Sequence, residues 1–236
     1  MQEQSSSPAK DSPPQLPATL MLSIGVGRGV SEQDFIKVHD ELTRRVKLLL
    51  PEVDRCQSCG FQGKLIAHHP NDIHDVHDER LGDCYLICDF CHAAAHLEMA
   101  GDKGGMVVRL PEISQGFLSR IMRALQIGVS IGAPNTQDMA KRIVTALQGR
   151  AQMCAQEWGS SKPKDFHKAI QSIGELTYEE SKGSLVDLRF VPSGNSPLID
   201  KKSLEVAIQS ARKADPQFER AEELMALLKT KEVLIG

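Results

Sequence analysis

The chain has 236 residues, of which 41% are hydrophobic and 25% charged, a composition typical of a soluble globular protein with one or two modest cores. Its 28 basic and 31 acidic side chains leave a net charge of −3, which argues against a general binder of polyanions. The first residues lack the basic start and apolar segment of a signal peptide, and no apolar run of about 18 residues occurs. We therefore expect a cytoplasmic protein without membrane insertion.

The N-terminal part combines a polar tail with a helix. Residues 1–18 are rich in serine and proline and nearly devoid of large apolar side chains, so we predict a disordered tail. A helix is expected to begin at Ser31, which forms a capping box with Asp34, and to end before Pro51. Its apolar side chains recur at helical spacing: Phe35, Val38, Leu42, Val46 and Leu49. We expect residues 19–113 to combine this helix with the cysteine-rich segment that follows.

Short elements are predicted between residues 56 and 110. A CQSCG turn is followed by the strand-like KLIA, a polar loop, and CYLICDFCH leading into an alanine-rich helix. His92 and His96 are expected one turn apart on one face of that helix. His74 and His77 belong to the polar loop, where we expect exposure to solvent. A glycine-rich turn then precedes the strand-like MVVRL.

Residues 114–236 are predicted to be a helical region. Ser114 is expected to cap the first helix, and in the next helix the apolar side chains of Met139, Ile143, Leu147 and Cys154 recur near helical spacing up to Trp158. Segment 184–191 is compatible with a strand or a helix. Residues 114–150 carry five basic and one acidic side chain, which solvated helix faces explain at least as well as a binding patch. The predicted helices cover 114–128, 136–158, 164–173, 203–214 and 216–231.

Two cysteine pairs indicate a metal site. Reduced cytosolic thiols favour metal binding over disulfides, and Cys56-x-x-Cys59 and Cys88-x-x-Cys91 are two knuckles that together supply four thiolates. Four thiolates form a closed tetrahedral shell for one structural Zn²⁺. Gly60 relieves the steric demand of the first turn. The remaining cysteines, Cys84 and Cys154, are expected to pack as small apolar side chains.

The segments LIAHHP and GDCYLICDFCHAAAH resemble the HNH, or ββα-metal, nucleases. The resemblance implies that His69 is a general base, with Asp83 at the position of the residue that orients it. It also implies a possible second divalent ion, bound by His68, His92 and His96. Such a site is chemically coherent, because a neutral imidazole can accept a proton from water while the metal stabilises the leaving oxygen.

Local sequence features argue against nuclease activity. Pro70 follows His69 directly, and Asp83 stands where the family has asparagine. Residues 51–100 carry nine acidic and three basic side chains, a net charge of −6 that would repel the phosphates of a nucleic acid. Direct nucleic-acid binding is therefore disfavoured, with or without catalysis, and the histidines are expected to be structural polar residues.

A wider set of motifs spans roughly residues 38–210: CQSCGFQ, CDFC, the glycine-rich turn, LPEISQGFL and LVDLRFVPS. With these motifs the sequence resembles the IcmJ/DotN family of type IVB secretion and related plasmid conjugation systems. The resemblance implies an HNH-like zinc fold used as architecture in a cytoplasmic coupling complex. The partners would be the coupling ATPase and its adaptors, at the inner face of the inner membrane.

Together these observations predict an α+β, mainly helical protein, in which an HNH-like ββα zinc module precedes a helical C-terminal part. The leading hypothesis is a non-enzymatic adaptor with one structural zinc. The competing hypothesis is a metal-dependent HNH DNA endonuclease. The sequence departs from the IcmJ/DotN pattern by retaining the histidine pairs His68–His69 and His92–His96, which keeps the second hypothesis open.

Overall fold

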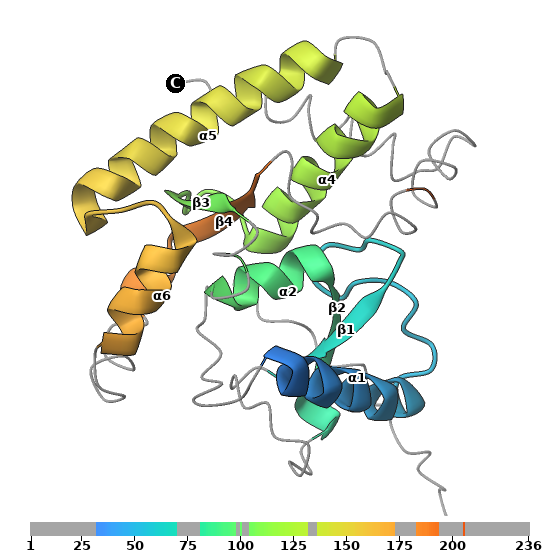
Figure 1. The fold of residues 1–236 in the computed structure, drawn as a ribbon. Helices are drawn as coiled ribbons and strands as arrows, with labels where there is room; N and C mark the ends of the chain where they lie inside the picture. The colour runs from blue at the N-terminus through green and yellow to red at the C-terminus, as the bar shows by residue number, and fades with distance from the viewer. Residues whose placement is uncertain are drawn as a thin grey trace, which may run out of the picture.

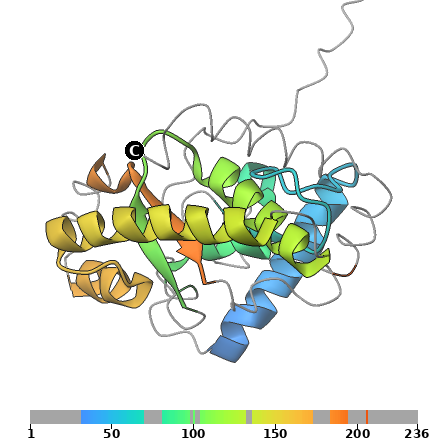
Figure 2. The same ribbon diagram turned by 90° about the horizontal axis from the view of Figure 1, so that it is seen from above.

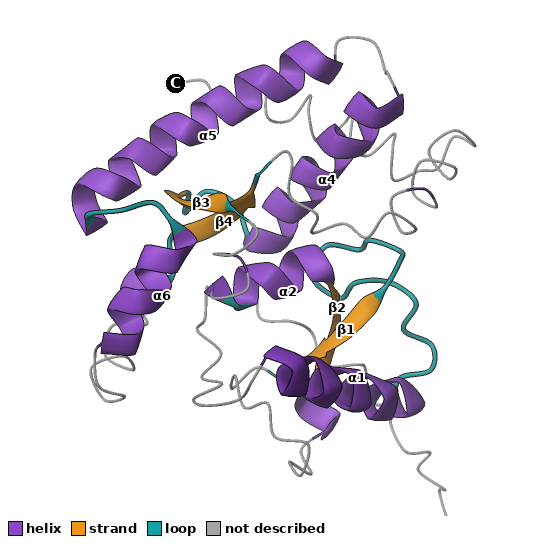
Figure 3. Ribbon diagram, viewed as in Figure 1, coloured by secondary structure: helices purple, strands orange, loops and turns teal. Residues whose placement is uncertain are grey.

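The computed structural model describes residues 32–69, 81–97, 100, 104–131, 136–172, 183–193 and 205. Within these ranges helices predominate beside two small antiparallel sheets, so the expected mainly helical α+β class is confirmed (Figures 1 and 3). No helix in the described part of the chain is long and apolar enough to cross a membrane. Several predictions concern residues outside the described ranges: the tail at 1–18, the cap at Ser31, the loop residues His74 and His77, and the helices at 203–214 and 216–231.

The first half of the fold is a helix packed on a strand pair. Helix α1 (Glu32–Leu49) contacts β1 (Leu65–His68), which pairs with β2 (Tyr85–Cys88) so that Leu65 lies opposite Cys88. The short 3-10 helix η1 (Leu81–Asp83) precedes β2, and α2 (Asp89–Ala95) follows it without a loop. The strand expected at KLIA is therefore present as β1.

Of the five apolar side chains predicted to recur along α1, the structure describes three, and those of Phe35 and Val38 lie outside the described part. Leu42 and Val46 are buried, as expected. Leu49, the last of the apolar side chains at helical spacing, is 55% exposed. Leu50, the next residue, is partly buried against the core instead, because its position on the helical surface lies closer to the line through Leu42 and Val46.

The second half is built around another strand pair. Strands β3 (Gly105–Arg109) and β4 (Leu188–Pro192) are antiparallel, and between them in sequence lie α4 (Gln115–Ile131), α5 (Thr136–Trp158) and α6 (Pro163–Ser172). The long helix α5 runs across β3 (Figure 2). The segment at 184–191, left open between helix and strand, contributes most of β4.

Helix α4 joins the two halves. The Ser114 hydroxyl accepts a hydrogen bond from the Phe117 N–H at 3.2 Å, which confirms the predicted cap. The Gln115 side chain donates to the Phe190 carbonyl at 2.9 Å and accepts from the Phe190 N–H at 2.7 Å, which attaches the start of α4 to β4. Since α4 also contacts α2 and α5, both halves share one buried core.

Candidate metal centre

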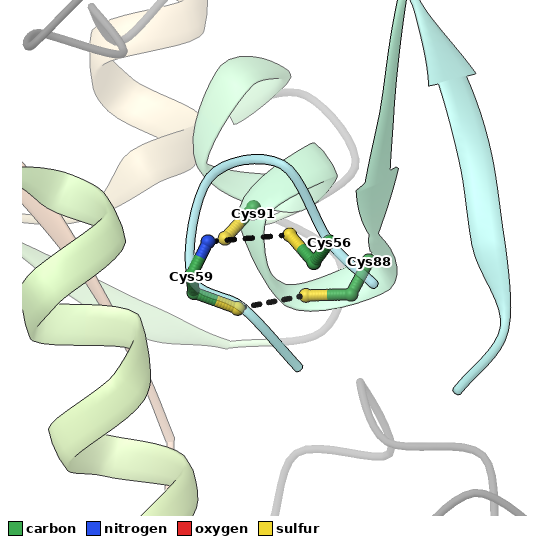
Figure 4. Close-up of side chains that lie close together, drawn as sticks. All are labelled: Cys56, Cys59, Cys88 and Cys91. Carbon is green, nitrogen blue, oxygen red and sulfur yellow. Dashed lines mark hydrogen bonds between the residues drawn. The ribbon is translucent and has the colours of Figure 1, made fainter. Parts of the chain in front are cut away.

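The four knuckle cysteines converge on one point in the core. Cys56 and Cys59 lie in the turn after α1, Cys88 ends β2, and Cys91 belongs to the first turn of α2 (Figure 4). Each is at most 3% exposed, and their sulfur atoms all lie within 4.8 Å of one another. The structure thus brings together the four residues that the spacing singled out.

Backbone hydrogen bonds shape the first knuckle. The Cys56 N–H donates to the Phe61 carbonyl at 2.8 Å, and the Gly60 N–H donates to the Cys56 carbonyl at 2.7 Å. Gly60 has a φ of +75°, a left-handed conformation that costs a residue with a Cβ roughly 1–2 kcal/mol. The glycine predicted to relieve this turn therefore does so.

A buried arginine lies beside the cysteines. Arg123 of α4 donates to the Cys88 sulfur at 3.1 Å and to the Asp89 carboxylate at 3.3 Å. Its guanidinium lies 3.6 Å from the ring centre of Phe61 and 4.9 Å from that of Phe90. Only 3% of Arg123 is exposed, so its positive charge acts on the sulfur cluster with little screening by water.

The basic side chains of residues 114–150 are therefore not simply solvated. That expectation was wrong for Arg123, because the negative charge of nearby thiolates can stabilise a buried guanidinium. Arg120 also serves the cluster by donating to the Cys59 carbonyl at 3.0 Å, and Arg150 pairs with Glu112 at 3.0 Å. The charge count over residues 51–100 missed Arg120 and Arg123, since both come from the later helix α4.

The sulfur atoms influence one another's ionisation. Burial opposes ionisation of Cys56, yet hydrogen bonds from Cys59, Cys88 and Cys91 bring its pKa well below the usual value. Hydrogen bonding to Cys56, and then to the other two cysteines of the cluster, raises the pKa of Cys91 well above its usual value. Burial also disfavours the charge on Arg123, but the neighbouring Cys88 and Cys59 raise its pKa. Four thiolates this close need a cation to ionise together.

The geometry and chemistry of the donors fit one zinc ion. Tetrahedral zinc with bonds of about 2.3 Å to sulfur has its ligand atoms about 3.8 Å apart. The sulfur atoms of Cys59 and Cys88 are 3.6 Å apart. Four sulfur donors leave no open coordination position for a substrate, so such a site is compatible with a structural role.

Five histidines are buried nearby. His68 ends β1, His69 follows it, His92 lies on α2, and His96 caps that helix; each is at most 5% exposed. The ring centres of His92 and His96 are 4.4 Å apart, which confirms their expected proximity on one face. The fifth histidine, His39 on α1, was not singled out in the sequence.

The histidines group differently from the nuclease expectation. Potential ligand nitrogens of His39, His92 and His96 all lie within 4.8 Å of one another, whereas the expected set contained His68 in place of His39. The His68 ring remains close, with its centre 5.2 Å from that of His96. Asp83 is exposed on η1, while His69 is only 2% exposed.

The buried imidazoles of His39, His68 and His96 are neutral at pH 7. Burial lowers the pKa of His96 to about 3. Burial, followed by repulsion from His96, lowers the pKa of His39 to about 4, and the same two causes bring that of His68 well below its usual value. The sequence did contain a sign that His39 is buried. This residue falls on the same helical face as Leu42 and Val46, where an apolar side chain is usual.

Comparison with known proteins gives one informative similarity. No family model matches the chain. The chain is 26% identical over 143 residues to the type 4 apparatus protein DotN of Legionella pneumophila. The alignment covers 58% of this chain and 66% of DotN, so the chain spans slightly less than two thirds of this curated relative. This similarity supports membership of the chain in the DotN/IcmJ family of type IV secretion proteins.

Proposed function

We propose that the chain is a structural, zinc-stabilised adaptor subunit of the cytoplasmic coupling complex of a type IVB secretion or conjugative transfer system. In this role it docks on the coupling ATPase and its adaptors, at the inner face of the inner membrane. The similarity to DotN supports the kind of machine. The observation that carries the structural role is the buried four-cysteine cluster, in which every donor would be used by one ion.

We further propose that Cys56, Cys59, Cys88 and Cys91 bind one zinc ion within an HNH-like ββα module. The order β1, β2, α2 supports this, because an antiparallel strand pair followed directly by a helix is the arrangement that the name ββα describes. A structural zinc supplies folding free energy on the order of 10 kcal/mol. It would thereby hold α1, the strand pair and α4 around a rigid centre.

A metal-dependent nuclease is the second candidate, and the cluster of buried histidines is the observation in its favour. Its base would be His69, oriented by Asp83. A general base must come within about 3 Å of the proton that it removes. His69 is 2% exposed and Asp83 lies on the surface, an arrangement that supports a structural role for His69 more than attack on a DNA backbone.

Gene deletion and complementation in the native host separate the two candidates. Deletion should abolish effector secretion or plasmid transfer, and the wild-type chain should restore it. His69→Ala should restore transfer nearly as well, since an adaptor needs no general base. Cys88→Ser should fail and should accumulate as insoluble or protease-sensitive protein without zinc, because the site loses a ligand and the fold loses its metal-binding free energy.

Cys84→Ala is the matched control, since Cys84 is equally buried but lies outside the four-cysteine cluster. It should retain stoichiometric zinc and support transfer. Failure of His69→Ala, combined with metal-dependent cleavage of plasmid DNA by the purified wild-type protein, would favour the nuclease instead. Folded wild-type protein without zinc would refute the proposed metal site.

A further inference from the structure

A second group of potential metal ligands lies beside the cysteine cluster. His39 of α1 and His92 and His96 of the α2 segment bring three imidazoles together, with candidate ligand atoms within 4.8 Å of one another. Their exposed fractions are 5%, 1% and 0%. Placing three imidazoles at one point in an otherwise apolar core costs free energy that a metal ion can offset.

The donor set suits a borderline transition metal. Neutral imidazole nitrogen binds Zn²⁺, Co²⁺ and Ni²⁺ well, whereas Mg²⁺ and Ca²⁺ prefer oxygen. The backbone of Ala67 on β1 also acts on His39 as a hydrogen-bonding group that raises the pKa of its ring. A histidine ligand commonly uses one ring nitrogen for such a bond, which fixes the ring and directs the other nitrogen to the metal.

We propose that His39, His92 and His96 bind a second divalent ion of the zinc class, with His68 as the fourth ligand. His68 is 5% exposed, and the structure records no hydrogen-bond partner for its Nδ1 among the described residues. Its ring centre lies 5.2 Å from that of His96 and 5.8 Å from that of His92, so a small rotamer change brings it to the same ion.

Participation of His39 gives this site a structural role. His39 belongs to α1, outside the ββα elements, so an ion bound here ties α1 to α2. The same α2 segment carries Cys91 immediately before His92, so two ions would hold it, one through sulfur and one through nitrogen. Within the described part of the chain all four ligands are buried, which favours a structural role over contact with a macromolecular substrate.

Packing without metal is the alternative explanation of the cluster. Imidazole rings also associate edge to face, as His39 and His92 do with an interplanar angle of 89° and a separation of 4.8 Å between ring centres. The two explanations predict different metal contents. They are also independent of the secretion role, because either could hold in an adaptor.

Metal stoichiometry of untagged, full-length protein distinguishes the explanations. After dialysis against excess Zn²⁺ and removal of loosely bound ions, the wild type should retain two ions per chain. His39→Gln should retain one. His167→Gln, on α6 and outside the cluster, should retain two. In Co²⁺-loaded protein, His39→Gln should keep the sulfur-to-cobalt charge-transfer absorption and lose one equivalent of cobalt.

A wild type that retains one ion per chain after loading, or a His39→Gln variant that retains two, would overturn the proposal. X-ray absorption at the zinc edge gives a second measurement that needs no variant. Two sites predict nitrogen and sulfur donors in similar numbers averaged over the ions, whereas sulfur donors alone would overturn the second site. The measurement therefore decides the matter even if His39→Gln does not fold.

Discussion

The buried Arg123 places a positive charge next to the sulfur cluster in the protein core. Four thiolates around Zn²⁺ carry a net charge of about −2 by simple valence. The guanidinium next to Cys88 offsets part of this charge, and Phe61 and Phe90 cover its faces. This buried positive charge is paired with the fully buried Cys88 and the partly buried Asp89, and removing one partner from such a buried arrangement is strongly destabilising.

Replacing Arg123 with methionine tests this role. The change keeps much of the apolar volume of the side chain but removes the guanidinium charge beside the sulfur cluster. Breaking a buried charge pair of this kind costs roughly 3–5 kcal/mol of folding free energy. Arg150→Met, which breaks the partly exposed pair with Glu112, is the control and should cost about 1 kcal/mol or less. Urea denaturation of the zinc-loaded proteins measures both changes, and equal losses would contradict the role assigned to Arg123.

Cys154 provides a prediction based on pKa, away from the metal sites. It is fully buried in α5, and burial, followed by repulsion from Glu157, raises its pKa to about 11. The folded state therefore holds this proton more tightly than the unfolded state, whose thiol pKa is about 9. The resulting stabilisation is complete below pH 9 and is lost as the pH rises towards 11.

Alkylation kinetics check this prediction. At pH 8 Cys154 should react with iodoacetamide much more slowly in the folded protein than in denaturant, because the reagent needs an accessible thiolate. Mass spectrometry of the peptide containing Cys154 gives both rates. Similar rates in the two states would show that the thiol is neither buried nor protonated as described.

At the scale of elements, a close contact sets the position of α4 on the first knuckle. A Cβ at Gly116 would collide with the backbone carbonyl oxygen of Ser58, so only glycine allows this approach. Gly149, in the middle of α5, has open space around the same position. Both glycines have the same low helix propensity, but only Gly116 packs closely against another segment of the chain.

Alanine substitutions exploit this difference. Gly149→Ala should stabilise the protein by about 0.5–1 kcal/mol through helix propensity alone. Gly116→Ala gains the same propensity, but forcing α4 away from Ser58 should cost about 1–3 kcal/mol and weaken retention of zinc against a chelator. Thermal unfolding ranks the variants, and a stabilised Gly116→Ala would refute the close packing of α4 on the knuckle.

Local elements could be predicted because their signals are local. Ser114 marks the start of α4, and the spacing of Ile143, Leu147 and Cys154 correctly identifies the buried face of α5. The CxxC spacings likewise singled out the four cysteines that the fold brings together. Each of these signals depends on neighbours within a few turns of chain.

Contacts between distant segments could not be predicted in the same way. His39 approaches His92 only because α1 packs on the β1–β2 pair, and Arg123 reaches Cys88 only because α4 packs against α2. Neither pairing leaves a periodic pattern in the sequence. Strand β4 was ambiguous for a related reason: its partner β3 lies about 80 residues earlier, so pairing across the fold determines its conformation.

At the scale of the whole molecule, the fold is organised around the α2 segment, which carries candidate metal ligands. The α2 segment carries ligands of both candidate sites and contacts β1, β2, α4 and β4. Helix α4 extends this organisation to the second sheet through Gln115 and Phe190. Such a rigid body is suited to an adaptor, whose purpose is to hold a partner in a defined position rather than to turn over a substrate.

Affinity purification from the native host tests the adaptor role most directly. A tagged chain, expressed from its own locus at its natural level, should recover the coupling ATPase and its adaptors in a constant ratio, identified by mass spectrometry. The same association should be seen with His69→Ala and should be lost with Cys88→Ser. Recovery of the folded, zinc-loaded chain without the coupling ATPase, from cells in which transfer is active, would contradict the proposed function.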